Sequence, residues 1–134
     1  MEQSNETAEP IRVLVVEDEI LISEWVAEAL TQQGFAVQAV TNADDAVGCL
    51  ATEAVDVLFT DINLPGGMDG AALARRAREL RPNLAVVYAS AQATALAPDA
   101  RVPGAVVLPK PYEPTLVGRL LAALSRTTAA AAPA

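Results

Sequence analysis

The chain has 134 residues, of which 52% are hydrophobic, so it can bury one sizeable core but leaves little material for a second. Its formal net charge of −8 would repel nucleic-acid phosphate and anionic lipid, which argues against binding to DNA or RNA. The chain contains no histidine and a single cysteine, Cys49, so an internal disulfide is excluded and a zinc site is not expected.

The two ends of the chain differ in composition from the rest. No apolar run approaches the roughly 18 residues of a membrane helix, and the N-terminus is polar and acidic, unlike a secretory signal. We therefore expect no membrane insertion and a cytoplasmic location. We also expect a flexible tail over residues 1–10, one domain over residues 11–126, and a flexible Ala-rich tail over residues 127–134.

Short apolar runs alternate along the chain with longer amphipathic stretches, a pattern typical of β-α units and a parallel sheet. The runs are rich in β-branched residues, and most of them read as strands buried on both faces. They lie at residues 11–16, 35–40, 55–60, 84–89 and 105–108.

Four amphipathic helices are expected between and after these strands. The first ends near Gly34, the second is capped by Asn42, the third spans residues 70–81, and the last follows Pro111. Spacings of three and four predict the inward side chains of these helices. These are Ile22, Trp25, Val26, Ala29 and Leu30 in the first, Val47, Leu50 and Ala51 in the second, Leu73, Ala77 and Leu80 in the third, and Leu116, Val117, Leu120, Leu121 and Leu124 in the last.

The segment between Ser90 and Ala105 is too poor in large apolar residues for a full helix. It contains two prolines and a glycine, which interrupt helical hydrogen bonding. We expect one turn of helix there at most.

Polar side chains follow four of the five predicted strands. Glu17, Asp18 and Glu19 follow the first, Asp61 the third, Ser90 the fourth and Lys110 the fifth. In an open parallel sheet, ligands bind at the carboxyl ends of the strands, so these groups are expected to converge on one edge.

Carboxylates packed so closely would repel one another unless a cation lies among them. Mg²⁺ prefers oxygen ligands, and Mn²⁺ is a possible substitute. Asp18 and Asp61 would ligate the ion directly, while Lys110 and Ser90 would contact oxygens of a phosphoryl group. The nucleophile would then be the carboxylate of Asp61.

Each of these residues also has an ordinary structural explanation when it is taken alone. The acidic triplet could simply begin a helix, Asp61 could be a turn residue, Ser90 a polar strand end, and Lys110 a solvated loop lysine. The functional interpretation depends on their joint placement at the ends of the strands.

The segments VLVVEDE, LFTDINLPGGMDG, VVYASA and VLPKPY occur in the order found in response-regulator receivers, and the chain resembles that family over about residues 11–125. The resemblance implies a flavodoxin-like, doubly wound α/β fold with five parallel strands in the order 2-1-3-4-5. It implies that Asp61 is the phosphoacceptor and Asp18 a direct metal ligand. Glu17 resembles a companion acid acting through water, and Asn63 a ligand through its backbone carbonyl.

The same resemblance assigns Ser90 as the switch hydroxyl and Lys110 as the family's lysine, commonly followed by a cis bond to proline, here Pro111. It implies a signalling protein that catalyses only its own phosphorylation and slow dephosphorylation. The phosphoryl group would come from phosphohistidine of a histidine kinase or histidine phosphotransferase. A change in the surface near Ser90 and Lys110 would then signal to a protein partner.

Three features depart from the common pattern of the family. Val107 stands where an aromatic residue is usual, the loop PGGMDG is one residue longer, and the fourth helical unit is short. The combination of the short fourth unit, the segment LPKPY and no attached effector resembles the stand-alone, atypical receivers of alphaproteobacterial type.

Two other functions stay open at this point. The first is a magnesium-dependent phosphatase with an aspartate nucleophile, although such enzymes need an acid where this chain has Asn63. The second is a receiver-fold scaffold that binds its partner without phosphorylation, which Val107 and the short fourth unit would allow.

Overall fold

The computed structural model describes residues 9–91 and 96–131, with side chains up to residue 125. Most of the expected N-terminal tail, residues 1–8, lies outside the described residues, as does the end of the C-terminal one. Within the described part of the chain, no helix is long and apolar enough to cross a membrane.

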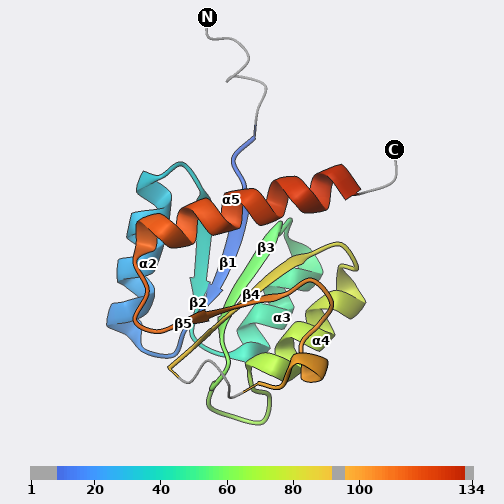
Figure 1. Cartoon of the computed structure of the whole chain (residues 1–134). Coiled ribbons are helices and arrows are strands. Elements are labelled where there is room, and N and C mark those ends of the chain that lie inside the picture. Colours follow the sequence, from blue (N-terminus) through green and yellow to red (C-terminus); the bar gives the residue numbers. More distant parts are fainter. Residues whose placement is uncertain (1–8, 92–95, 132–134) are drawn as a thin grey trace, which may run out of the picture.

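Five parallel strands form one sheet in the order β2-β1-β3-β4-β5, which confirms the predicted fold (Figure 1). The strands are β1 (Arg12–Val16), β2 (Ala36–Val40), β3 (Val57–Asp61), β4 (Ala85–Ser90) and β5 (Val106–Pro109). Every residue of β3 and β4 is buried, as expected for central strands covered on both faces. The edge strand β2 is largely exposed.

Four helices cover the two faces of the sheet. They are α2 (Ile20–Gln32), α3 (Ala43–Thr52), α4 (Gly70–Leu80) and α5 (Pro114–Ala131). The helices α2 and α5 belong to the same hydrophobic cluster as Val13 and Val15, whereas α3 and α4 belong to the cluster that contains Leu14 and Val16. Successive strand residues point to opposite faces, so β1 supplies both cores.

The helices α3 and α4 begin at the predicted residues. The side chain of Asn42 accepts a hydrogen bond from the backbone N–H of Asp45 at 2.8 Å, and Asp69 caps α4 in the same way through Ala72. Gly34 adopts a positive φ of 101° just after α2, as expected of a residue that ends a helix there.

Parts of the predicted core were wrong. Trp25 and Leu116 are 52% and 56% exposed, and Ala51 is also exposed. Spacings of three and four predict a broad apolar stripe along a helix. The sheet covers only the centre of that stripe. In α2 that centre is Val26 and Leu30. The helix α5 extends to Ala131 and so includes part of the segment that was expected to be a flexible tail.

The short fourth unit agrees with the prediction in the residues that the structure describes there. Its helical content is one 3₁₀ turn, η1 (Pro98–Ala100), and residues 92–95 lie outside the description. The hydroxyl of Tyr88 accepts a hydrogen bond from the N–H of Val102 at 3.2 Å. The Arg78 guanidinium donates to the carbonyls of Leu84 and Pro103, each at 2.7 Å. Two side chains thus anchor a segment that lacks a helix to fix it.

We predict that Tyr88→Phe lowers the free energy of unfolding by about 1–3 kcal/mol, because it leaves the N–H of buried Val102 without its acceptor. Denaturant unfolding would measure the loss, and amide hydrogen exchange at Val102 would locate it. Tyr112→Phe is the matched control, since Tyr112 is only partly buried. Equal losses in the two variants would contradict this role for the Tyr88 hydroxyl.

Candidate functional site

Three carboxylates meet where the sheet order reverses, between β1 and β3. Glu17 and Asp18 follow β1, Asp61 ends β3, and one oxygen of each lies within 4.8 Å of the others. The parallel register pairs Val16 with Thr60, so the two strands deliver their next residues side by side. The sheet topology therefore creates the acidic cluster that the sequence predicted.

Lys110 supplies a positive charge to this cluster. Its Nζ lies 2.9 Å from Oδ2 of Asp61 and 3.3 Å from Oε1 of Glu17. The backbone N–H of Lys110 donates to the carbonyl of Ser90 at 2.8 Å, which fixes the end of β5 against β4. The bond from Lys110 to Pro111 is cis, as the resemblance implied.

The charged groups are held in partly desolvated positions. Glu17 is 3% exposed and Asp61 is 8% exposed, whereas Asp18 is open to solvent. Burial raises the pKa of Glu17, although a hydrogen bond from the N–H of Glu19 and the charge of Lys110 oppose the rise. Burial acts to lower the pKa of Lys110, but its hydrogen bonds and charge interactions with Asp61 and Glu17 raise it overall. The ammonium form is therefore favoured beside Asp61.

Ser90 and Asn63 join the site from neighbouring positions. Ser90 ends β4 and is fully buried, and its carbonyl contacts Lys110 as described above. The backbone N–H of Asn63 donates to Oδ1 of Asp61 at 3.2 Å. Both carboxylate oxygens of Asp61 are thus held, one by Asn63 and the other by Lys110.

Gly70 belongs to the site, although the sequence analysis treated it only as the start of a helix. Its N–H donates to the carbonyl of Ile62 at 2.7 Å. A Cβ on this residue would lie 2.0 Å from the backbone oxygen of Asp61 and 2.8 Å from Cα of Ile62. Only a glycine lets α4 approach the backbone behind Asp61 so closely. Its place in the quoted segment PGGMDG was the available signal.

Three aromatic rings contact one another between the core and the surface. The ring of Phe59 on β3 meets Tyr112 edge to face at 5.4 Å, and Tyr112 stacks on Trp25 at 6.4 Å. Burial and the charge of Glu17 raise the pKa of Tyr112 to about 12, so the hydroxyl stays protonated. Sequence spacing alone could not bring Trp25 and Tyr112 together, because they lie on different elements.

A doubly wound parallel sheet in the order 2-1-3-4-5 places the chain in the flavodoxin-like class of α/β proteins, and its acids and lysine lie at the switch point of that sheet. Residues 13–122 match the response regulator receiver domain family, and the chain belongs to that family. It is therefore a receiver domain of two-component signalling. This assignment favours signalling over the phosphatase interpretation.

Individual relatives agree with the family assignment. The response regulator receiver protein CpdR of Brucella abortus is 38% identical over 103 residues, which cover 75% of this chain and 85% of that protein. The transcriptional regulatory protein TctD of Salmonella typhimurium is 36% identical over 124 residues. That match covers 89% of this chain but only 54% of TctD, so the chain spans about half of that relative's length.

Solved structures show the same architecture. A response regulator receiver protein from Sinorhizobium medicae matches with a TM-score of 0.84 and 30% identity, over 90% of this chain and 98% of that one. The receiver domain of the hybrid histidine kinase CckA matches with a TM-score of 0.72 and 25% identity, over 85% and 98% of the two chains.

We predict that Gly70→Ala lowers the free energy of unfolding by about 1–3 kcal/mol, because the added methyl group must displace the backbone of Asp61. Amide chemical shifts of Asp61 and Ile62 would report the displacement. The control is Gly48→Ala in α3, where a Cβ meets nothing within 4 Å and the change should stabilise the helix by about 0.5–1 kcal/mol. A Gly70 variant as stable as the wild type would contradict the close approach.

We also predict a pH-dependent effect of Glu17→Gln in metal-free buffer. The folded protein has a raised Glu17 pKa, so it holds that proton more tightly than the unfolded chain does. The wild type therefore loses stability as the pH rises from the unfolded pKa to the folded pKa, and stays penalised above both. Relative to the wild type, the variant should gain stability over this interval and keep the gain near neutral pH.

Unfolding curves measured across that pH range would test the sign of this effect. Glu19→Gln is the control, because Glu19 is an exposed neighbour on the same segment. Parallel stability profiles for the wild type and Glu17→Gln would show that burial of the Glu17 carboxylate has no such cost.

Proposed function

We propose that Asp61 accepts a phosphoryl group from phosphohistidine of a histidine kinase or histidine phosphotransferase, in a reaction that requires Mg²⁺. The resulting change at Ser90 and Lys110 would alter a surface that a protein partner reads. The observation that carries the proposal is the Lys110–Asp61 ion pair at 2.9 Å, formed beside Glu17 and Asp18 at the switch point of the sheet.

The contacts of Asp61 suit a carboxylate nucleophile. An oxygen of Asp61 would form a bond to phosphorus while the bond from phosphorus to the donor's imidazole nitrogen breaks. The donor ring, protonated at its other nitrogen, takes the bonding electron pair and leaves as neutral imidazole. Lys110 would then pair with a phosphoryl oxygen instead of with the free carboxylate. Ser90, at the end of the adjacent strand, would supply a hydroxyl to another phosphoryl oxygen.

The donor set fits a hard divalent cation. Carboxylate oxygens from three residues lie within 4.8 Å of one another, and Lys110 balances only part of their charge. Asp18 and Asp61 would ligate Mg²⁺ directly, Asn63 through its backbone carbonyl, and Glu17 through water. Mn²⁺ would suit the same ligands. When bound, the ion would neutralise charge that develops on the phosphoryl oxygens.

Tyr88 supports a route from this chemistry to the surface. The family's usual aromatic position is Val107, but the register places Tyr88 of β4 directly opposite it. Tyr88 is two residues before Ser90, so both side chains are on the same face of β4. Its hydroxyl contacts the N–H of Val102 in the segment after η1. A shift at Ser90 would thus reach residues 96–105 through Tyr88.

We predict that incubation with acetyl phosphate and Mg²⁺ adds one phosphoryl group to the wild type and none to Asp61→Asn. Asn has the same shape as Asp but is a far weaker nucleophile. Intact-mass spectrometry would detect the adduct, which should be labile in base, and chelation of the metal should abolish it. Asp44→Asn, an exposed acid on α3, is the control and should be modified normally.

The same experiment can separate phosphorylation from signal transmission. Beryllofluoride with Mg²⁺ should shift the amide resonances of Ser90, Lys110 and Val102 in the wild type but not in Asp61→Asn. An adduct that persists in Asp61→Asn would overturn the assignment of the nucleophile. Shifts that reach Ser90 and Lys110 but not Val102 would instead favour a scaffold that does not switch.

A further inference from the structure

Thr60 is a buried polar residue that the proposed reaction does not use. It precedes Asp61 on β3 and is only 1% exposed. The register places it between Val16 of β1 and Tyr88 of β4, which belong to the hydrophobic cluster shared with α3 and α4. A hydroxyl in such surroundings is costly unless it forms a hydrogen bond. The partner of the Thr60 hydroxyl therefore indicates what this residue does.

The hydroxyl of Thr60 contacts the backbone of Asp61. Its Oγ1 donates a hydrogen bond to the carbonyl oxygen of Asp61 at 2.9 Å. The start of α4 packs against the same oxygen, since a Cβ on Gly70 would lie 2.0 Å from it. The carbonyl group of Asp61 is thus held by a buried hydroxyl and by the close approach of a helix.

The peptide group after Asp61 carries this constraint toward the carboxylate. The carbonyl of Asp61 and the N–H of Ile62 belong to one planar unit, so a bond at either end restricts the rotation of both. Thr60 holds the first end, and the carbonyl of Ala89 accepts a hydrogen bond from the second at 3.1 Å. The next N–H, that of Asn63, donates to Oδ1 of Asp61 at 3.2 Å. The position of Asn63 therefore depends on how this peptide group is oriented.

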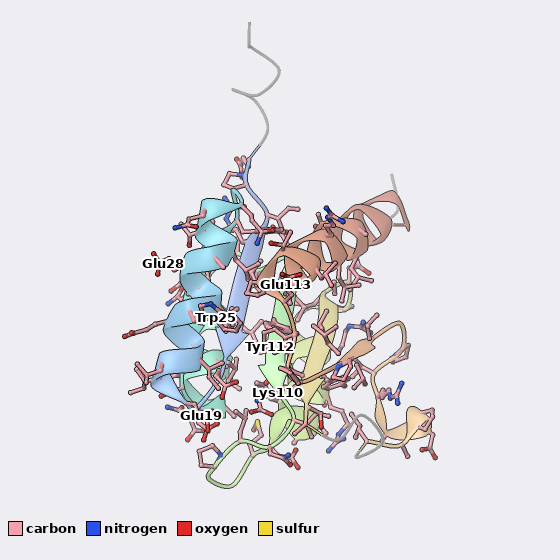
Figure 2. The ribbon with its side chains drawn as sticks, turned by 60° about the vertical axis from the view of Figure 1, so that its left-hand side comes forward. Glu19, Trp25, Glu28, Lys110, Tyr112 and Glu113 are labelled. Atoms are coloured by element: carbon pink, nitrogen blue, oxygen red, sulfur yellow. The ribbon has the colours of Figure 1, made fainter. Side chains whose placement is uncertain are left out.

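The carboxylate of Asp61 has a second contact that comes from another part of the chain. Lys110, labelled in Figure 2, lies at the end of β3 that carries Asp61, and its Nζ is 2.9 Å from Oδ2. The two carboxylate oxygens thus have separate partners, Lys110 and Asn63. A rotation of the peptide group would move Asn63 and turn the carboxylate away from Lys110.

We propose that Thr60 is a positioning residue, whose hydroxyl fixes the peptide group after Asp61 and thereby the direction of the carboxylate that accepts the phosphoryl group. The inference rests on the proposed function. It adds a residue that contacts neither the phosphoryl group nor the cation and acts through Asp61 alone. Fixing a reacting group in advance speeds a reaction, because the group need not be ordered during the step.

Two substitutions at Thr60 separate the hydroxyl from the shape of the side chain. Thr60→Val keeps the shape and loses the hydroxyl, whereas Thr60→Ser keeps the hydroxyl and loses a methyl group. In metal-free buffer, Thr60→Val should speed amide hydrogen exchange of Ile62 and Asn63 by about tenfold relative to the amide of Leu58, which reports on unfolding of the whole strand. Thr60→Ser should leave this ratio within about threefold of the wild type.

The rate of phosphorylation tests the functional half of the proposal. With acetyl phosphate at saturating Mg²⁺, Thr60→Val should react about tenfold or more slowly than the wild type, because its carboxylate is no longer held in one direction. Thr60→Ser should recover most of the rate. Intact-mass spectrometry over a time course would measure all three proteins.

Leu58→Val is the matched control for a loss of stability. Leu58 is fully buried two residues before Thr60, on the same strand and in the cluster on the same face. The substitution removes a methylene group from that cluster and leaves the hydrogen bond to Asp61 in place. Measured where every variant is folded, its phosphorylation rate should stay within about twofold of the wild type.

Several outcomes would overturn the proposal. Unchanged exchange at Ile62 and Asn63 in Thr60→Val would show that the hydroxyl does not fix the peptide group. Faster exchange with a normal phosphorylation rate would show that the carboxylate does not depend on it. A Thr60→Ser variant as slow as Thr60→Val, or equal slowing by Leu58→Val, would assign the effect to packing. A wild type that takes no phosphoryl group would refute the proposed function instead, and the exchange measurement would still decide whether Thr60 holds the backbone of Asp61.

Discussion

The ion pair between Lys110 and Asp61 is the interaction on which the other features of this protein depend. It joins Lys110, which follows β5, to Asp61 of β3 across a cluster of carboxylates that would otherwise repel one another, and these two strands are not neighbours in the sheet. Burial of Glu17 and Asp61 makes the arrangement costly without a cation. Lys110 offsets part of that cost, and the remainder makes the site receptive to a divalent ion.

The exposed apolar residues at the start of α2 lie next to the acidic site. The helix α2 starts directly after the acids that follow β1, so its exposed apolar residues lie beside the cluster. Lys110 contacts the acids, and Tyr112, two residues later, stacks on Trp25 of α2. The same backbone segment therefore contacts both the acidic site and α2.

The segment after β4 is held by side-chain hydrogen bonds in place of a full helix. Without a fourth full helix, the described part of this segment buries Leu96 and Val102 in the same cluster as Tyr88. Hydrogen bonds from Arg78 and to Tyr88 replace the contacts that a helix would make. The aromatic residue absent at position 107 is present on the neighbouring strand, where sequence comparison by position would not look for it.

The sequence by itself determined the alternation of strands and helices, the caps at Asn42 and Gly34, and the identities of Glu17, Asp18, Asp61 and Lys110. The strand order was implied by the resemblance to receivers. Alternating apolar runs and strand-end acids are local patterns that depend on no distant partner. Tertiary structure decided the remainder. It left Trp25 exposed and stacked on Tyr112, set Gly70 against the backbone of Asp61, and placed Tyr88 opposite Val107. Each of these depends on how closely elements far apart in the chain approach one another. Periodicity within one element cannot predict such an approach.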